Sequence, residues 1–164
     1  MKYIVKQKMF SIADKFTIQN ERQEDCFQVR GKIFSLRGRL SFLDMAGAEL
    51  LCIEKKLFRF LPEYVFYRDG TEVATVKKLF ALFRNKFAIR GTHGEFSIDG
   101  NAFAYDFQIR NESGVVAVIS KKWFAWRDTY GVDIVADVDP AFILALVIVI
   151  DQVLHPRTKS SSSR

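Results

Sequence analysis

The chain has 164 residues, of which 49% are hydrophobic, and its mean hydropathy is +0.00. This length and composition are typical of one folded domain with its own core, and they exclude a disordered chain. The net charge is +6, but three of the cations, Arg157, Lys159 and Arg164, lie in a tail that contains no acid. The remaining 22 basic and 19 acidic residues make the body only mildly basic. Such a balance is as typical of ordinary surface charge as of a protein with an anionic partner.

The N-terminal segment predicts a cytoplasmic protein. Charges interrupt the first residues, Met1 to Lys8, so this segment lacks the apolar run of a signal peptide. The two cysteines, Cys26 and Cys52, have no partner at the spacing of a metal site or a redox motif. Each cysteine is therefore expected to be a reduced, buried, small hydrophobic residue.

Short β-strands are predicted along the first two-thirds of the chain and again just before the C-terminal segment. Polar and apolar residues alternate there with a period of two, and turn signals separate the runs. The spacing of the runs indicates a sandwich or a barrel. The alternating runs are 15–19, 26–30, 40–44, 64–68, 103–110 and 130–135. The turn signals are 20–22, 30–31, 37–38, 46–47, 69–70, 91–94, 99–101 and 112–114.

An internal repeat predicts that the sheet closes on itself. The sequence Phe-Gln-Val-Arg-Gly at 27–31 matches Phe-Ser-Ile-Asp-Gly at 96–100, an offset of 69 residues. Matches of 14–18 to 85–89 and of 53–58 to 119–124 have offsets of 71 and 66 residues. Two similar antiparallel halves, each too small to bury its own face, are expected to close together and leave no free sheet edge.

The most hydrophobic segment lies near the C-terminus and predicts a buried helix. Pro140 suits the first turn of a helix and Asp139 suits its cap. The ten residues between Pro140 and Asp151 are all apolar, so the helix has no polar face and must be enclosed. Ten residues rise only about 15 Å, whereas a bilayer needs about 20 apolar residues. The expected organisation is a barrel over 1–155 with its central helix at about 140–154, and a disordered polar tail over 156–164.

Lysine pairs recur in a repeated Gly-x-x-apolar-x-x-apolar-x-Lys-Lys unit and form the candidate binding site. In the structural interpretation, these lysines end hairpin strands at the surface and keep the edges solvated. In the functional interpretation, the pairs gather at one rim and bind an anionic head group. Each cation near an anionic membrane contributes about 1 kcal/mol. The candidate ligand-binding residues are Lys55, Lys56, Lys77, Lys78, Lys121, Lys122 and Arg127.

The most aromatic stretch, 123–130, has three interpretations. Trp126 and Tyr130 fit a core corner that packs on the central helix. Exposed tryptophans beside Lys121, Lys122 and Arg127 would instead fit a membrane-interface anchor or a platform on which bases stack. Because no nucleic-acid motif accompanies the stretch, we favour the core corner and expect no nucleic-acid partner.

Neither a metal site nor a catalytic constellation is predicted. Asp133, Asp137 and Asp139 lie close together and leave calcium binding open, but the spacing of an EF-hand loop is absent, so capping and loop solvation are favoured. His93 and His155 are isolated and make neither a zinc site nor a triad. The motifs of nucleophile elbows, P-loops and dinucleotide sites are also missing. We therefore expect a protein that is not an enzyme and needs no cofactor.

The segment 114–134, which includes Ser-Lys-Lys-Trp-Phe and Asp-Thr-Tyr-Gly-Val, resembles the LURP-one-related family, as does the apolar helix 139–151. The resemblance extends from about Tyr3 to Leu154. It implies the fold of the Tubby C-terminal domain, a closed antiparallel barrel of about twelve strands around one central hydrophobic helix. Phospholipid scramblases look like distant relatives.

The resemblance implies a role at membrane lipid and carries no catalytic residues with it. We predict a non-enzymatic module that recognises anionic phospholipid or phosphoinositide at a membrane surface through the rim lysines. A protein-interaction or structural module without lipid dependence is the alternative. A scramblase-like activity is the third possibility. It fits less well, because the chain lacks the Pro-rich and Cys-rich N-terminal region of scramblases and has Asp151 and Gln152 directly after the apolar run.

Overall fold

The computed structural model describes residues 1–6, 15–32, 38–82, 86–121 and 129–155. Strands make up most of this part of the chain, and the helix follows the last strand. The elements are β1 (Lys2–Lys6), β2 (Lys15–Asn20), β3 (Asp25–Lys32), β4 (Arg39–Leu43), β5 (Glu49–Lys55), β6 (Glu63–Arg68), β7 (Thr71–Leu79), β8 (Lys86–Gly91), β9 (Gly94–Asn101), the 3-10 turn η1 (Ala102–Ala104), β10 (Asp106–Asn111), β11 (Gly114–Ser120), β12 (Thr129–Ile134) and α2 (Pro140–Leu154).

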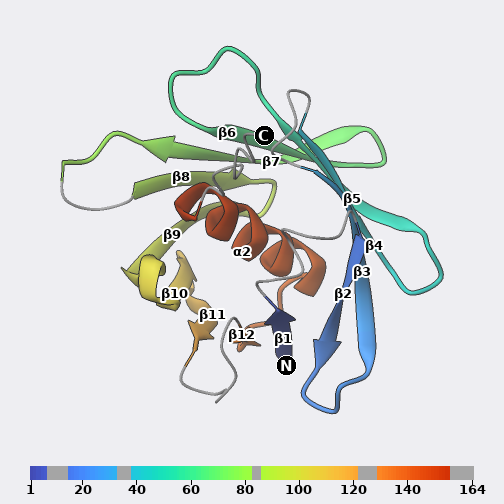
Figure 1. Cartoon of the computed structure of the whole chain (residues 1–164). Helices are drawn as coiled ribbons and strands as arrows, with labels where there is room; N and C mark the ends of the chain where they lie inside the picture. The colour runs from blue at the N-terminus through green and yellow to red at the C-terminus, as the bar shows by residue number, and fades with distance from the viewer. Residues whose placement is uncertain (7–14, 33–37, 83–85, 122–128, 156–164) are drawn as a thin grey trace, which may run out of the picture.

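The twelve strands form one closed antiparallel barrel. Each strand pairs with its neighbours in the sequence, and the order around the barrel is β1-β12-β11-β10-β9-β8-β7-β6-β5-β4-β3-β2. The first strand closes the sheet, because Tyr3 pairs with Val132 of β12 on one side and with Asn20 of β2 on the other. The predicted fold class is therefore confirmed, and the strands surround α2 as Figure 1 shows.

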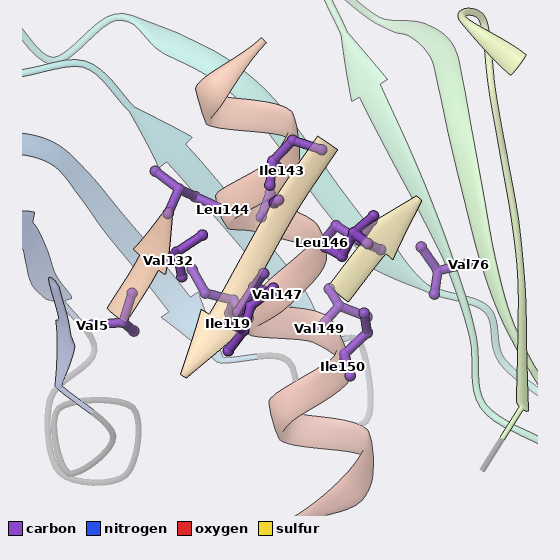
Figure 2. Packing of buried hydrophobic residues seen from close by; sticks show 14 of the residues in the cluster. Val5, Val76, Ile119, Val132, Ile143, Leu144, Leu146, Val147, Val149 and Ile150 are labelled. Atoms are coloured by element: carbon purple, nitrogen blue, oxygen red, sulfur yellow. The ribbon is translucent and has the colours of Figure 1, made fainter. Parts of the chain in front are cut away.

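The helix α2 passes through the middle of the barrel, and its buried side chains form the centre of the core. The carboxylate of Asp139 caps the helix by accepting a hydrogen bond of 2.9 Å from the backbone N–H of Ala141. Every residue of α2 except Pro140 and Phe142 is buried. Its aliphatic side chains meet inward-facing strand residues on several sides (Figure 2). A helix without a polar face is thus accommodated inside the sheet rather than in a bilayer.

The two halves of the barrel repeat the same strand pattern, as the internal repeat predicts. Gly31 in β3 and Gly100 in β9 occupy equivalent positions, with φ angles of 109° and 111°. A Cβ atom on Gly100 would lie 2.7 Å from the backbone oxygen of Asp106, and one on Gly31 would collide with the backbone oxygen of Arg39. Glycine is required at both places because the next strand approaches too closely for a side chain.

The structure corrects several details of the predicted elements. The turns predicted at 30–31 and 99–101 are wrong, because Gly31 and Gly100 still pair with the next strand and are followed by one more residue of β3 and of β9. The strand predicted at 103–110 begins only at Asp106, after η1 and the left-handed residue Tyr105. Cys52 is buried as predicted, whereas Cys26 is only half-buried. The predictions for the tail 156–164 lie outside the described residues.

Candidate functional site

Strand topology brings the described candidate lysines to one end of the barrel. Because all neighbouring strands are antiparallel, the odd-numbered strands end where the even-numbered strands begin. The pairs 55–56 and 77–78 lie at the ends of β5 and β7, and Lys121 directly follows β11. We call this end of the molecule the basic end and the opposite end the acidic end. The connection β5–β6 and the end of β7 lie on the same side of the barrel, away from the turns β4–β5 and β6–β7 (Figure 1).

Charge is distributed unevenly between these two ends. The helix α2 runs from the acidic end to the basic end, so its positive N-terminus and negative C-terminus oppose the charge around each. At the basic end, the described strand termini and connections carry Lys6, Lys15, Arg30, Arg39, Lys55, Lys56, Arg59, Lys77, Lys78, Lys86 and Lys121 against Glu54, Glu63, Asp99 and Asp106. At the acidic end they carry Glu21, Glu24, Asp25, Asp44, Glu49, Asp69, Glu72, Glu95, Glu112, Asp133, Asp137 and Asp139 against Lys2, Arg22, Arg68, Arg90 and Arg110.

The lysine pairs 55–56 and 77–78 flank the beginning of β6. Glu63 is the acid between them, and its carboxylate lies 3.9 Å from Nζ of Lys77 and 3.3 Å from Nε of Arg59. Within the described part of the chain, the other three lysines of the two pairs have no ion-pair partner. The basic end therefore retains positive charge that is available to an anionic surface.

Lys121 lies apart from these two pairs, because β8, β9 and β10 separate β11 from β7. Its ammonium group lies 4.2 Å from the centre of the Tyr105 ring, which is a cation–π contact. The structure thus places Lys121 at the basic end but apart from the other candidate lysines. Lys122 and Arg127 lie outside the described residues, as do both tryptophans.

Buried polar side chains fix the C-terminal end of α2 at the basic end. The hydroxyl of Tyr105 donates a hydrogen bond to the carboxylate of Asp151, and Nδ1 of His155 lies 3.1 Å from the same carboxylate oxygen. The rings of Tyr105 and Tyr130 stack with their centres 4.7 Å apart. Burial, reinforced by the charge of Asp151, raises the pKa of Tyr130 well above its ordinary value. The core corner predicted for Tyr130 is therefore confirmed, and this cluster anchors the helix.

Large apolar side chains project into solvent beside the lysine pairs. Phe58 and Phe60 are fully exposed, at 102% and 97%, in the connection from β5 to β6. Phe80 and Leu82 are 75% and 79% exposed in the connection from β7 to β8. These side chains lie in two connections at the same end of the barrel, and exposed apolar patches mark sites of interaction with a protein or a membrane. We call the two segments 57–60 and 79–82 the apolar loops; their exposed members are Leu57, Phe58, Phe60, Leu79, Phe80 and Leu82.

Phe58 occupies a backbone conformation that bulky side chains rarely adopt. Its φ angle is 57°, in the left-handed region that favours glycine. A left-handed phenylalanine costs free energy, and here no burial of the ring offsets that cost. The apolar loops were not predicted from the sequence, because apolar residues were expected to lie in the core. The signal was the run Leu-Phe-Arg-Phe-Leu-Pro at 57–62, which follows a lysine pair and does not alternate.

The aspartates 133, 137 and 139 do not gather into one cluster of three in the structure. Asp139 caps α2 and forms an ion pair with Arg68, which confirms the predicted capping role. Asp133 lies 3.5 Å from the N-terminal ammonium group. Over the residues described, no group of three or more His, Cys, Asp or Glu side chains is arranged to hold a metal ion. None of the helices in that part of the chain is long and apolar enough to cross a membrane.

Comparison with known proteins agrees with this architecture. A family model described as LURP-one-related matches residues 1–151. The chain belongs to the LURP-one-related family. This finding confirms the resemblance predicted from the segments 114–134 and 139–151, and it extends over nearly the whole barrel.

Two LURP-one-related comparisons give the sequence identity to one relative and the structural similarity to one solved structure. The protein of Bacillus subtilis (strain 168) named uncharacterized protein YxjI is 37% identical over 151 residues, which cover 92% of each chain. A solved structure of the Arabidopsis thaliana protein AT5G01750 superposes with a TM-score of 0.68 at 18% identity, over 93% of this chain and 90% of that one. The bacterial relative shows the family, and the plant structure shows the fold alone.

Proposed function

We propose that this LURP-one-related barrel binds anionic phospholipid membranes with its basic end and inserts the apolar loops among the head groups. One observation carries the proposal: Phe58, Phe60 and Phe80 are exposed at the same end of the barrel as the lysine pairs 55–56 and 77–78. Lysines alone would be ordinary surface charge. Exposed Phe and Leu among Lys and Arg are typical of surfaces that bind peripherally to membranes.

The charge distribution would orient the molecule on such a membrane. Each cation close to an anionic bilayer contributes about 1 kcal/mol, an effect that falls off within a Debye length of about 8–10 Å. The basic end is therefore attracted, whereas the carboxylates of the acidic end are repelled. Lipid binding by this route needs no precise pocket, which fits phosphatidylserine as well as phosphoinositide head groups.

The apolar loops would add a hydrophobic contribution to the membrane affinity, and salt does not screen this contribution. Complete burial of a phenylalanine side chain contributes up to about 3 kcal/mol. Even partial insertion of Phe58 and Phe60 would then slow dissociation. The strain at Phe58 is compatible with this role, because unfavourable backbone conformations are retained where they serve function.

The proposed binding mode leaves the core of the barrel intact. The helix α2 stays inside the sheet, whereas a scramblase-like activity would require the helix to leave it. A protein partner with an acidic face and an apolar groove would use the same surface and is distinguished by the test below.

Vesicle flotation with the full chain tests this proposal. The vesicles contain phosphatidylcholine alone, or with phosphatidylserine, or with phosphoinositide, and each is used at low and at high salt. One variant combines Lys56→Glu and Lys86→Glu, and a second combines Phe58→Gly and Phe60→Ser. A control variant, Arg22→Glu with Arg90→Glu, makes the same charge change at the acidic end.

We expect binding to anionic vesicles only, loss of binding in the lysine variant, and unchanged binding in the control. The phenylalanine variant should bind at least about tenfold more weakly at high salt. It should be at least as stable as the wild type, because glycine relieves the left-handed strain at position 58. Absence of binding to every vesicle would contradict membrane binding and favour a protein partner. An equal loss in the control variant would contradict binding through the basic end.

A further inference from the structure

A cavity of about 550 Å³ opens at the acidic end, where the first turn of α2 meets the end of β8 and the beginning of β9. It lies at the opposite end of the barrel from the apolar loops. Its volume falls in the range of small-molecule sites. The turn from β8 to β9 forms one wall and is held in place by a hydrogen bond of 2.8 Å from the backbone N–H of Thr92 to the carbonyl of Val73.

The floor of this cavity is the only part of α2 that is not buried. Pro140 and Phe142 are the two incompletely buried residues of the helix, and both line the cavity. The ring of Phe142 lies with its centre 5.4 Å from that of Phe96, and Val73 and Val138 complete an apolar wall. Such a surface suits an aromatic or branched aliphatic group, because two aromatic faces and aliphatic side chains are available to contact it.

The charges at the rim favour a cationic ligand over an anionic one. Arg68 lines the cavity, but its guanidinium group is bound by the carboxylate of Asp139. The backbone N–H of Ala141 at the beginning of the helix also donates to Asp139, so an anion would have to displace this carboxylate. Asp137 is exposed at the rim and has no ion-pair partner within the described ranges. The negative field of the acidic end acts in the same direction.

We infer that this cavity binds a small organic amine. The apolar body of the ligand packs on Phe96 and Phe142, and its ammonium group lies at the rim beside Asp137. Polar side chains of Thr92, His93 and Asn111 border the same opening. This binding does not depend on the proposed membrane function, because the two surfaces lie at opposite ends of the barrel and share no residue.

Three probes with the same phenylbutyl body and different head groups test the inference. The full chain, labelled with ¹⁵N, is titrated at pH 7 with 4-phenylbutylamine, 4-phenylbutanol and 4-phenylbutyrate, which carry a positive, no and a negative charge. We expect saturable shifts of the Thr92 and His93 amide signals with the amine. The alcohol should bind more weakly, and the carboxylate should not bind.

A matched pair of variants distinguishes a direct contact of Asp137 with the ammonium group from the general attraction of the negatively charged acidic end. Asp137→Asn should weaken amine binding by about fivefold or more and leave alcohol binding unchanged. Asp69→Asn removes the same charge outside the cavity, at a left-handed position that suits asparagine, and should have little effect. The inference is overturned if no probe binds saturably, if the carboxylate binds as well as the amine, or if Asp69→Asn weakens amine binding as much as Asp137→Asn.

Discussion

Tyr64, near the beginning of β6, shows how strongly the barrel wall isolates single side chains from water. It is only 2% exposed, and burial raises the pKa of its hydroxyl to about 12. An unfolded tyrosine titrates near pH 10. The folded state therefore holds this proton more tightly than the unfolded state does, and the resulting stabilisation is complete below about pH 10 and is lost as the pH rises toward 12.

The replacement Tyr64→Phe should reduce this alkaline loss of stability. A pKa difference of about two units corresponds to about 2–3 kcal/mol in the free energy of unfolding. Urea unfolding at pH 8 and at several values above pH 10 measures it, and the variant should lose less stability than the wild type by about that amount. Tyr130, whose pKa burial also raises, keeps part of the dependence in both proteins. Identical pH dependences for variant and wild type would show that the Tyr64 hydroxyl is solvated.

Residue patterns predicted the lysines of the candidate surface but not the phenylalanines. The lysine pairs repeat with the strands, so their spacing could be recognised without coordinates. Phe58 and Phe60 lie in a connection, where period-two alternation carries no information about burial. Their exposure follows from the length and backbone angles of that connection, which the residue types alone do not determine.

At the scale of elements, α2 was the part of the fold most strongly specified by the sequence. The cap Asp139, the first-turn Pro140 and ten consecutive apolar residues determine its beginning, its type and its burial. Strand ends were less well specified. Turns were predicted at Gly31 and Gly100, but both residues lie within strands. Glycine occurs both in turns and where two strands approach closely, so the residue type alone does not distinguish the two.

A charge inside α2 tests whether the barrel depends on its central helix. Leu146 is completely buried among the strand residues, so Leu146→Asp would place an unpaired carboxylate in the core at a cost of several kcal/mol. That is a large fraction of the stability of about 5–15 kcal/mol that is typical of a domain. We expect loss of the cooperative unfolding transition followed by circular dichroism. Leu82→Asp, at an exposed position, should leave the transition unchanged.

A well-folded Leu146→Asp variant would mean that α2 can leave the barrel. The helix would then be free to interact with lipid directly, and a scramblase-like mechanism would gain support. A destabilised variant would instead agree with a helix that serves only as the core.

At the scale of the whole molecule, the closed antiparallel barrel turns a repeat along the sequence into two ends of opposite charge. The repeat places lysine pairs after alternate strands, and antiparallel closure collects the ends of those strands on one side. The sequence therefore predicted the barrel and its central helix. It left open whether the lysine pairs share one end, and it gave no sign of the cavity at the opposite end, because both depend on topology. The cavity joins residues of β6 to β10 with the first turn of α2, and no local pattern brings such distant segments together.

The central claim is that the basic end of the barrel inserts into anionic membranes. Measuring how deeply each end of the barrel lies in a membrane tests this claim most directly. An environment-sensitive fluorophore is attached to a single cysteine, introduced as Phe60→Cys in an apolar loop or as Ser113→Cys at the acidic end, in a chain whose Cys26 and Cys52 are replaced by alanine. With phosphatidylserine vesicles, we expect the probe at position 60 to shift to the blue and to be quenched by quenchers attached to the lipid. The probe at position 113 should stay in water. A response at position 113, or none at position 60 while the protein floats with the vesicles, would contradict insertion of the basic end.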